Sequence, residues 1–208
     1  DSASPFATDA LHAALEAWRQ RGRFPTASVM SESRVLVAMS GGVDSSTACL
    51  LSHQAGREVI GVTMRLWSDP ECEAGNAPGC CSPSAIRDAR EVCHSLGLPH
   101  LTVDYSDEFA DIVVADFVSE YLAGRTPNPC TRCNGYFRFP ELACLADGLG
   151  AAGIVTGHYA LIRERAGGHL LARARDRAKD QSYMLWRISS GILPRLEFPL
   201  GCLTKPET

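Results

Sequence analysis

The stretch that decides the fold runs from Val35 to Ser46 and reads VLVAMSGGVDSS. It opens with a continuous apolar run, which is typical of a strand that is buried on both faces of a parallel sheet. The run from Thr47 to Leu51 has a helical composition, and Gly56 is placed to end that helix. A turn of glycine and serine therefore joins a buried strand directly to a helix.

Strands and helices alternate outward from this stretch. Further strands are expected at residues 58–64, 100–103 and 154–156, and further helices at 84–96, 107–122 and 136–149. Loops are expected at 68–82 and 125–134, and a hairpin at 160–165 and 169–174. From 182 on the chain is expected to be helical and then irregular. The alternation predicts an α/β fold with a doubly wound, mostly parallel sheet, a β-hairpin and a helical C-terminal extension. Such sheets bind ligands at the carboxyl ends of their strands, so we expect the unusual loops to converge there.

Composition places the chain among ordinary globular proteins. It has 208 residues, 45% of them hydrophobic, with 24 acidic and 20 basic side chains. This suffices for one sizeable domain without disulfide bonds. Apolar runs stay far below the ~18 residues of a membrane span, so no membrane partner is expected. The net charge of −4 excludes a uniformly basic surface, although it allows a local one.

The sequence divides into three parts. Residues 1–33 are expected to form a helical extension, 34–160 the main α/β domain, and 161–208 a hairpin and helical segment. Nine cysteines without a visible signal peptide indicate a reducing, cytoplasmic setting, with an organellar one as the alternative. Asp9 and Glu16 argue against a transit peptide.

The turn from Ser40 to Ser46 has the composition of a phosphate-binding loop. Its glycines allow close approach of an anion, its hydroxyls can donate hydrogen bonds, and the helix N-terminus offers free N–H groups. It lacks the lysine of the GxxxxGK[ST] loop. Asp44 would repel phosphate unless a metal ion accompanied it. SGGVDSS after such a strand resembles the PP-loop of the ATP pyrophosphatases, which cleave ATP to AMP and pyrophosphate and so activate an oxygen with AMP.

A CxxC motif, Cys130 to Cys133, follows two prolines in the stretch TPNPCTRCN. By itself the motif fits half of a zinc site, half of an iron–sulfur site or a redox pair, with zinc the commonest. Cys80 and Cys81 are the nearest candidates for further ligands, and three of these four cysteines could hold an iron–sulfur cluster.

The ordered motifs resemble the bacterial tRNA-specific 2-thiouridylases of the MnmA type. The matching stretches are TPNPCTRCN at 126–134, FRF at 137–139, TGHY at 156–159 and KDQSY at 179–183, supported by GVTMRLW at 61–67, CCS at 80–82 and FPLG at 198–201. The resemblance covers residues 34–206. It implies that 34–160 form a PP-loop ATP-binding catalytic domain and that 161–208 begin a truncated tRNA-binding region.

The resemblance implies roles for individual residues. ATP would be bound by Ala38, Met39, Ser40, Gly41, Gly42, Val43, Asp44, Ser45, Met64 and Gly157. The target base would lie against Asn128, Pro129 and Cys130, with Cys133 as the nucleophile. The tRNA would be contacted by His158, Lys179, Asp180 and Gln181.

The implied reaction has two halves. ATP with Mg²⁺ adenylates the C2 oxygen of the wobble uridine (U34) in the tRNA anticodon loop, and a persulfide sulfur then displaces AMP. A persulfide sulfur-donor protein is the second expected partner. Arg132 beside Cys133 is expected to favour its thiolate. The base would have to leave its stack to react.

Two departures from the family pattern bear on the cysteines. Relatives commonly have Asp where this chain has Cys130, which favours a cluster or a disulfide between Cys130 and Cys133 during turnover. Relatives also carry the persulfide-bearing cysteine and two further domains beyond the segment matched here, and Cys202 is expected to be an ordinary loop thiol.

Charge is unevenly distributed. Residues 163–187 contain seven basic side chains, and 104–120 contain six acidic ones and no basic one. A basic stripe fits RNA phosphates, although a solvated hairpin face would look the same. Two alternatives to the thiouridylase are another PP-loop sulfur transferase or ligase, and a nucleotide-binding module with a structural metal or iron–sulfur site.

Overall fold

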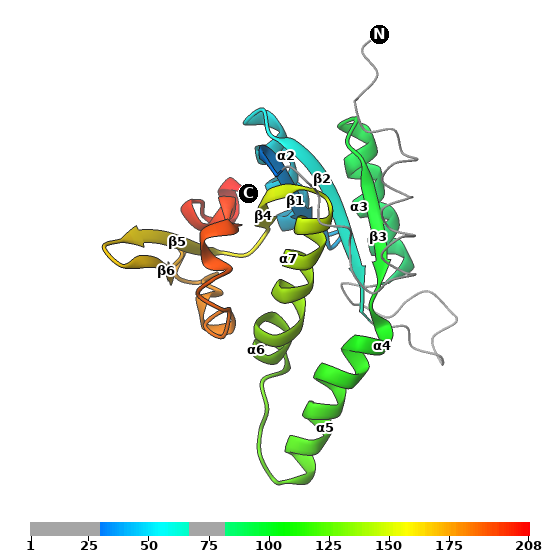
Figure 1. Ribbon diagram of the computed structural model, residues 1–208, viewed down its shortest axis with the longest axis vertical. Helices are drawn as coiled ribbons and strands as arrows, with labels where there is room; N and C mark the ends of the chain where they lie inside the picture. Colours follow the sequence, from blue (N-terminus) through cyan, green and yellow to red (C-terminus); the bar gives the residue numbers. More distant parts are fainter. Residues whose placement is uncertain (1–29, 67–81) are drawn as a thin grey trace.

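The computed structural model describes residues 30–66 and 82–208 (Figure 1). The predictions for the N-terminal extension, for most of the loop at 68–82, and for Cys80 and Cys81 concern residues outside these ranges. The structure confirms the predicted α/β class.

A five-stranded sheet forms the centre of the molecule. Its strands are β1 (Ser31–Ala38), β2 (Glu58–Arg65), β3 (His100–Asp104), β4 (Ala151–Thr156) and β7 (Leu196–Glu197). They run in the order β3-β2-β1-β4-β7, and every pair is parallel. The strand order reverses at β1, so the loops after β1 and β4 flank the point where such sheets bind ligands.

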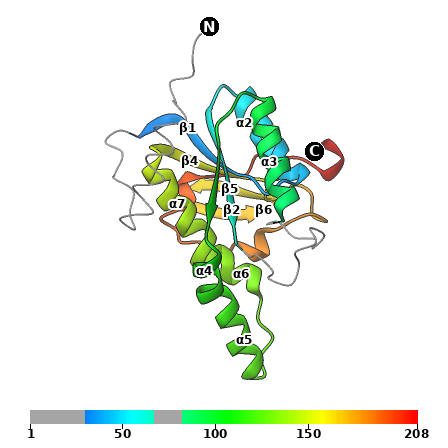
Figure 2. The same cartoon turned by 90° about the vertical axis from the view of Figure 1, so that its right-hand side faces the viewer.

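Helices cover both faces of the sheet (Figure 2). On one face α2 (Val43–Gln54) and α3 (Pro83–Ser95) pack on residues such as Val35, Val37 and Val59. On the other face α7 (Phe139–Gly148) packs on Leu36, Ile60 and Ile154. Successive residues of β1 thus point to opposite faces and are buried on both, as the apolar run predicted.

An elongated helical arm extends away from the sheet, as both views show. It consists of α4 (Ser106–Phe109), the π-helical turn η1 (Ala110–Val114) and α5 (Ala115–Leu122). The chain returns through α6 (Pro129–Cys133) and a second π-helical turn, η2 (Asn134–Arg138), to α7. Within the described part of the chain, no helix is both long and apolar enough to cross a membrane.

The C-terminal part of the chain adds a hairpin and short turns. The hairpin pairs β5 (Ala160–Arg165) with β6 (Gly168–Arg173) and forms a separate two-stranded sheet. The 3-10 turns are η3 (Ser182–Met184), η4 (Leu193–Arg195), η5 (Pro199–Cys202) and η6 (Lys205–Glu207).

Three sequence predictions need correction. The first helix begins at Val43 rather than at Thr47, so the second half of the PP-loop is already helical. The stretch predicted as a loop at 125–134 contains α6, because Asn128 caps it and Pro129 occupies its first turn. The expected helix from Ser182 on consists of 3-10 turns, and β7 joins the sheet there as an edge strand.

Candidate nucleotide-binding site

The loop after β1 is held in shape by its own hydroxyls. The Ser40 amide donates to Ser45 Oγ over 3.1 Å, and Ser45 Oγ donates to the Gly42 carbonyl over 3.0 Å. Gly42 precedes α2 without a side-chain cap, so no side chain of the described residues competes for the first N–H groups of this 12-residue helix. The N-terminus of α2 is therefore available to an anion.

Gly41 adopts a conformation that only glycine tolerates well. Its φ is +76°, and a Cβ atom there would lie 2.2 Å from the carbonyl oxygen of Ala85 in α3. The loop consequently lies directly against the start of α3. On its other side Gly157 allows the chain after β4 to approach α2, because a Cβ there would lie 2.7 Å from the Ser45 amide nitrogen.

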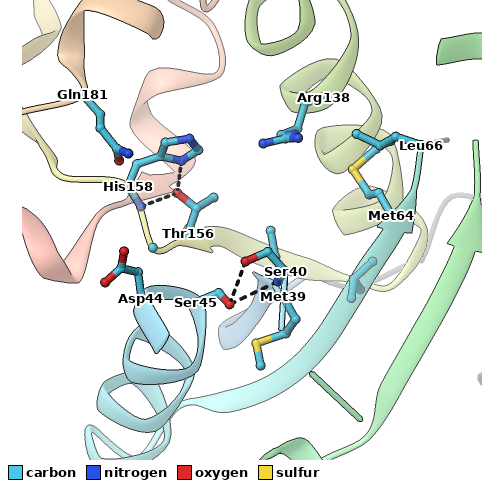
Figure 3. Close-up of a pocket in the computed structure, with 13 residues that line it drawn as sticks. Met39, Ser40, Asp44, Ser45, Met64, Leu66, Arg138, Thr156, His158 and Gln181 are labelled. Carbon is cyan, nitrogen blue, oxygen red and sulfur yellow. Dashed lines mark hydrogen bonds between the residues drawn. The ribbon is translucent and has the colours of Figure 1, made fainter. Parts of the chain in front are cut away.

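A cavity of about 240 Å³ opens between these loops (Figure 3). Its lining residues come from the ends of β1, β2 and β4, from α2, from η2 and from the segment before η3. They are Ala38, Met39, Ser40, Asp44, Ser45, Val62, Met64, Leu66, Arg138, Thr156, Gly157, His158 and Gln181. The lining combines apolar and sulfur-containing side chains with hydroxyls, a carboxylate, an amide and a guanidinium. Such a mixture suits a ligand with a flat apolar part and an anionic part.

Most residues expected to bind ATP line this cavity. Those that do are Ala38, Met39, Ser40, Asp44, Ser45, Met64 and Gly157. Gly41, Gly42 and Val43 form the turn beside it instead, and the Val43 side chain is 64% exposed.

His158 is a neutral base in the cavity wall. Burial, and to a lesser extent the nearby Arg138 guanidinium, lower the pKa of His158 to about 3. Its Nδ1 lies 2.8 Å from Thr156 Oγ1, and its ring lies 6.0 Å from that of Phe139. At neutral pH Arg138 is therefore the only cation among the described residues that line the cavity.

Asp44 is the cavity's carboxylate, and it is already engaged. Tyr159 Oη donates to Asp44 Oδ1 over 3.0 Å, and Lys205 Nζ donates to the same oxygen. The Asp44 carboxylate in turn raises the pKa of Lys205. Lys205 comes from η6, so the C-terminal turns supply a counter-charge to the PP-loop.

The CxxC motif lies on α6 rather than in a loop. Asn128 Oδ1 accepts a hydrogen bond from the Thr131 amide over 3.1 Å and so caps the helix. Cys130 is exposed, whereas Cys133 is 7% exposed. Arg132 pairs with Asp116 over 3.4 Å, so its guanidinium is directed toward α5.

In the described residues, no three His, Cys, Asp or Glu side chains lie close enough together to hold a metal ion. A cluster on Cys130 and Cys133 would need Cys80 or Cys81, which lie outside residues 30–66 and 82–208.

The residues expected to contact tRNA separate into three groups. His158 and Gln181 line the cavity. Asp180 is occupied within the chain, since its Oδ1 accepts from the Ala174 amide over 2.8 Å and its Oδ2 from Ser182 Oγ over 2.8 Å. Exposed side chains are Asn128, Pro129, Cys130 and Lys179.

Sequence reasoning missed Arg138, Thr156 and Lys205 as site residues. Arg138 and Thr156 belong to motifs that the sequence had already marked, at 137–139 and 156–159. No local signal marks Lys205, which reaches Asp44 from 161 positions away.

Comparisons with known proteins show which family the chain belongs to. Residues 33–208 match the family model described as the tRNA methyl transferase HUP domain. The chain is 50% identical over 180 residues to a tRNA-specific 2-thiouridylase MnmA of Amoebophilus asiaticus (86% of this chain, 48% of the relative). A relative of the same name from Thermus thermophilus is 47% identical over 180 residues (84% and 48%).

The chain thus spans about half the length of these curated relatives. A solved structure titled as a predicted subunit of tRNA methyltransferase from Methanocaldococcus jannaschii has a TM-score of 0.49 at 17% identity, covering 84% of this chain and 71% of that chain. The family match extends over all but the first residues of the chain, and the chain belongs to the tRNA methyl transferase HUP domain family, with curated relatives named tRNA-specific 2-thiouridylase MnmA.

Proposed function

We propose that this chain is the ATP-using, base-activating part of a tRNA-uridine 2-sulfurtransferase that acts on the wobble uridine. One observation carries the proposal: η2 connects the two halves of the required chemistry. Arg138, its last residue, lines the PP-loop cavity, and Cys133, the residue before its first, belongs to the CxxC helix.

ATP would occupy the cavity with its adenine against the apolar side chains of the lining and its phosphates at the PP-loop. Met39, Met64 and Leu66 offer the apolar contacts. The phosphates would meet the N-terminus of α2, the Ser40 and Ser45 hydroxyls and the Arg138 guanidinium, all of which favour negative charge. Mg²⁺ bound with ATP would neutralise phosphate charge, and Asp44 is the cavity carboxylate that would hold it.

The first step forms a bond between the C2 oxygen of the uridine and the α-phosphorus of ATP. The bond from that phosphorus to the bridging oxygen breaks, and pyrophosphate leaves with the electron pair. Arg138 would stabilise the charge that builds up on the phosphate oxygens. His158, which has a pKa of about 3, stays neutral and so can accept a hydrogen bond without adding positive charge.

The second step delivers sulfur. The outer sulfur of a persulfide on the donor cysteine attacks C2, and AMP leaves with the electron pair of the C2–oxygen bond. The Cys133 thiolate then attacks the donor's inner sulfur, so the S–S bond breaks, the base keeps the outer sulfur, and a disulfide joins Cys133 to the donor. A reductant such as a small thiol must then regenerate both thiols.

The burial of Cys133 sets a condition on this step. Cys130 is the exposed thiol of the pair, and Cys133 belongs to the buried core cluster that also contains Leu185 and Phe137. The base, once it has left its stack, would therefore have to approach a largely buried sulfur at the last residue of α6.

Isotope exchange between pyrophosphate and ATP tests the first step separately from the second. We expect exchange to depend on a tRNA with uridine at the wobble position and not on one with cytidine there. Ser45→Ala should reduce exchange at least tenfold, because it removes a phosphate donor and the internal bonds of the loop. Exchange without tRNA, or with another acceptor, would instead indicate a different PP-loop ligase.

The cysteines are separated by product analysis in the same reactions. Cys133→Ser should keep pyrophosphate exchange and lose 2-thiouridine formation in the presence of a persulfide donor. Cys130→Ser should keep both activities at least in part. If Cys130→Ser alone abolishes thiolation, the nucleophile has been assigned to the wrong cysteine. If neither the chain nor a longer form of the protein consumes ATP with tRNA, the proposal fails.

A further inference from the structure

Three exposed aromatic side chains lie beside α6, and nothing above gives them a function. Tyr136, Tyr183 and Trp186 are 51%, 62% and 63% exposed. Two arginines lie over the rings of Tyr136 and Trp186. The Arg132 guanidinium carbon is 4.6 Å from the Tyr136 ring centre, and that of Arg187 is 5.6 Å from Tyr136 and 4.8 Å from Trp186. We refer to these five residues as the aromatic–arginine surface.

The surface is rigidly supported. Gly135 brings η2 against the chain after η3, because a Cβ there would lie 2.5 Å from Arg187 Cβ. The buried Asn134 amide donates to the Met184 carbonyl over 3.2 Å. Leu185 and Ile188, on either side of Trp186 and Arg187, are 1% and 7% exposed and anchor the segment in the core. The rings are thus presented to solvent by a backbone that is fixed beneath them.

The surface borders the cavity along two separate segments. In η2, Tyr136 is two residues from Arg138, which lines the cavity. In the second segment, Tyr183 is two residues from Gln181, which lines it as well. This second segment, drawn in orange in Figure 1, lies beside α6 in both views. A ligand that extends out of the cavity past α6 would therefore meet the aromatic–arginine surface.

We propose that the aromatic–arginine surface stacks an unpaired RNA base that neighbours the reacting uridine. The proposal rests on the function proposed above and names a part of the binding site for its RNA substrate. Aromatic rings and arginine planes at this spacing are the groups on which unpaired bases stack, and they do so without reading sequence. Arg187 makes no ion pair within residues 30–66 and 82–208, so its charge is free for a phosphate.

Position favours RNA over a protein partner. The surface borders the cavity in which the proposed RNA substrate would react. Arg187 places a cation beside the Trp186 ring, which suits the phosphate next to a stacked base. A duplex would hide its base faces from all three rings. The occupant is therefore a single-stranded loop with exposed base faces and phosphates.

Tryptophan fluorescence provides a direct test. The chain has three tryptophans, and the double variant Trp18→Phe, Trp67→Phe keeps Trp186 as the only one. Stacking of a base on Trp186 should quench its emission when a stem-loop RNA with an unpaired seven-nucleotide loop is added. The same RNA closed into a full duplex should leave the emission unchanged. If the loop RNA binds without quenching, or fails to bind, the proposal is overturned.

Affinity measurements by fluorescence anisotropy of labelled RNA provide the second test. Trp186→Ala and Tyr136→Ala should each weaken loop binding about tenfold, and Trp186→Phe should restore most of it. Tyr121→Ala is the matched control, since Tyr121 is 58% exposed on α5 and pairs with Phe117 alone among the aromatic contacts of the described residues. Equal affinity of Trp186→Ala and the unsubstituted chain would contradict the proposal.

ATP binding in the cavity distinguishes the two proposals. Trp186→Ala should bind a fluorescent ATP analogue as the unsubstituted chain does, because Trp186 is not among the cavity residues. Intact RNA stacking without tRNA-dependent ATP consumption by the chain or a longer form would refute the proposed function and keep the stacking surface. If Trp186→Ala thiolates at the full rate and binds RNA with full affinity, the stacking proposal fails and the proposed function stands.

Discussion

His158 shows how a single side chain links the cavity to the stability of the fold. Its pKa is lowered to about 3 from an ordinary value of 6.5, because burial disfavours the charged ring. The folded chain thus keeps His158 neutral while the unfolded chain protonates it. Stability from this group is complete above about pH 6.5 and is lost as pH falls toward 3.

The first prediction follows from this sign. Between pH 6 and 4 the free energy of unfolding should fall by up to about 1.4 kcal/mol per pH unit for each histidine held neutral. His100, whose pKa burial lowers to about 4, contributes in the same direction. His158→Gln should reduce the slope in urea titrations at several pH values, and exposed His53→Gln should not. An unchanged slope in His158→Gln would contradict the assignment.

Lys205 is the second residue whose effect can be isolated. It neutralises Asp44 beside the expected phosphates, so Lys205→Ala should weaken ATP binding about threefold to tenfold at low Mg²⁺. The difference should narrow as Mg²⁺ rises, because the cation takes over the role of the ammonium group. Lys179→Ala, at an exposed position, is the control and should bind ATP normally. Equal affinities at every Mg²⁺ concentration would show that the pair is incidental.

At the scale of the elements, the PP-loop and α6 depend on their boundary residues. Gly41 and Gly56 have nearly the same φ, +76° and +74°, in very different surroundings. A Cβ at Gly41 meets the Ala85 backbone, whereas nothing lies within 4 Å of one at Gly56. Alanine substitutions at these two positions therefore separate the free-energy cost of backbone strain, which both share, from that of a steric clash, which only Gly41 has.

The third prediction uses this pair. Gly56→Ala should cost about 1–2 kcal/mol from the left-handed conformation alone. Gly41→Ala should cost about 1–3 kcal/mol more, because α3 must move, and it should also abolish ATP binding. Chemical denaturation and nucleotide titration measure both effects. The explanation fails if the two variants are equally stable and both bind ATP.

The fourth prediction concerns Asn128, which the family resemblance assigns to the target base and the structure assigns to the cap of α6. Asn128→Ala should lose about 1 kcal/mol of local stability and increase amide exchange in α6. Asn128→Asp keeps a capping oxygen and should preserve exchange protection. If Asn128→Asp nevertheless loses thiolation, the amide also contacts the base; if it thiolates normally, capping is its whole role.

The sequence could predict those elements whose signals are local. The apolar run before SGGVDSS predicts β1, the turn and the helix after it, and the structure confirms them within a few residues. The CxxC helix was not predicted from the sequence, because Pro127, Pro129 and the loop-like composition outweighed the helix-capping signal of Asn128. The strand β7 has only two residues, so no period could reveal it. Parallel pairing with β4 is what holds these two residues in a strand conformation.

At the scale of the whole molecule, the C-terminal segment stabilises the site through ion pairs with residues that are far away in the sequence. Arg57, before β2, donates to both carboxylate oxygens of Glu197 in β7 at 3.1 and 3.0 Å. This ion pair fixes the segment that continues to Lys205 and the PP-loop. Long-range contacts of this kind have no local pattern, which is why sequence reasoning found the loop and missed its counter-charge.

The fifth prediction tests that connection. Arg57→Ala should cost about 1 kcal/mol, speed up hydrogen exchange in residues 196–208 and weaken ATP binding through Lys205. Arg125→Ala is the matched control, because Arg125 also makes two bonds to one carboxylate, that of Glu120, within the helical arm. Mass-spectrometric exchange of both variants measures the effect. Unchanged exchange in residues 196–208 would mean that the ion pair does not fix the segment.

The pairing of Asp44 with Lys205 also has a consequence for the chain as it is being made. The two residues are 161 positions apart. At a synthesis rate of about 5–20 residues per second, roughly 8–32 seconds pass between their translation. Early in that interval the nascent chain has its PP-loop residues, whereas β4, Gln181 and Lys205 have not yet been made. The cavity wall and the counter-charge of Asp44 are therefore complete only after the last of these residues has been translated.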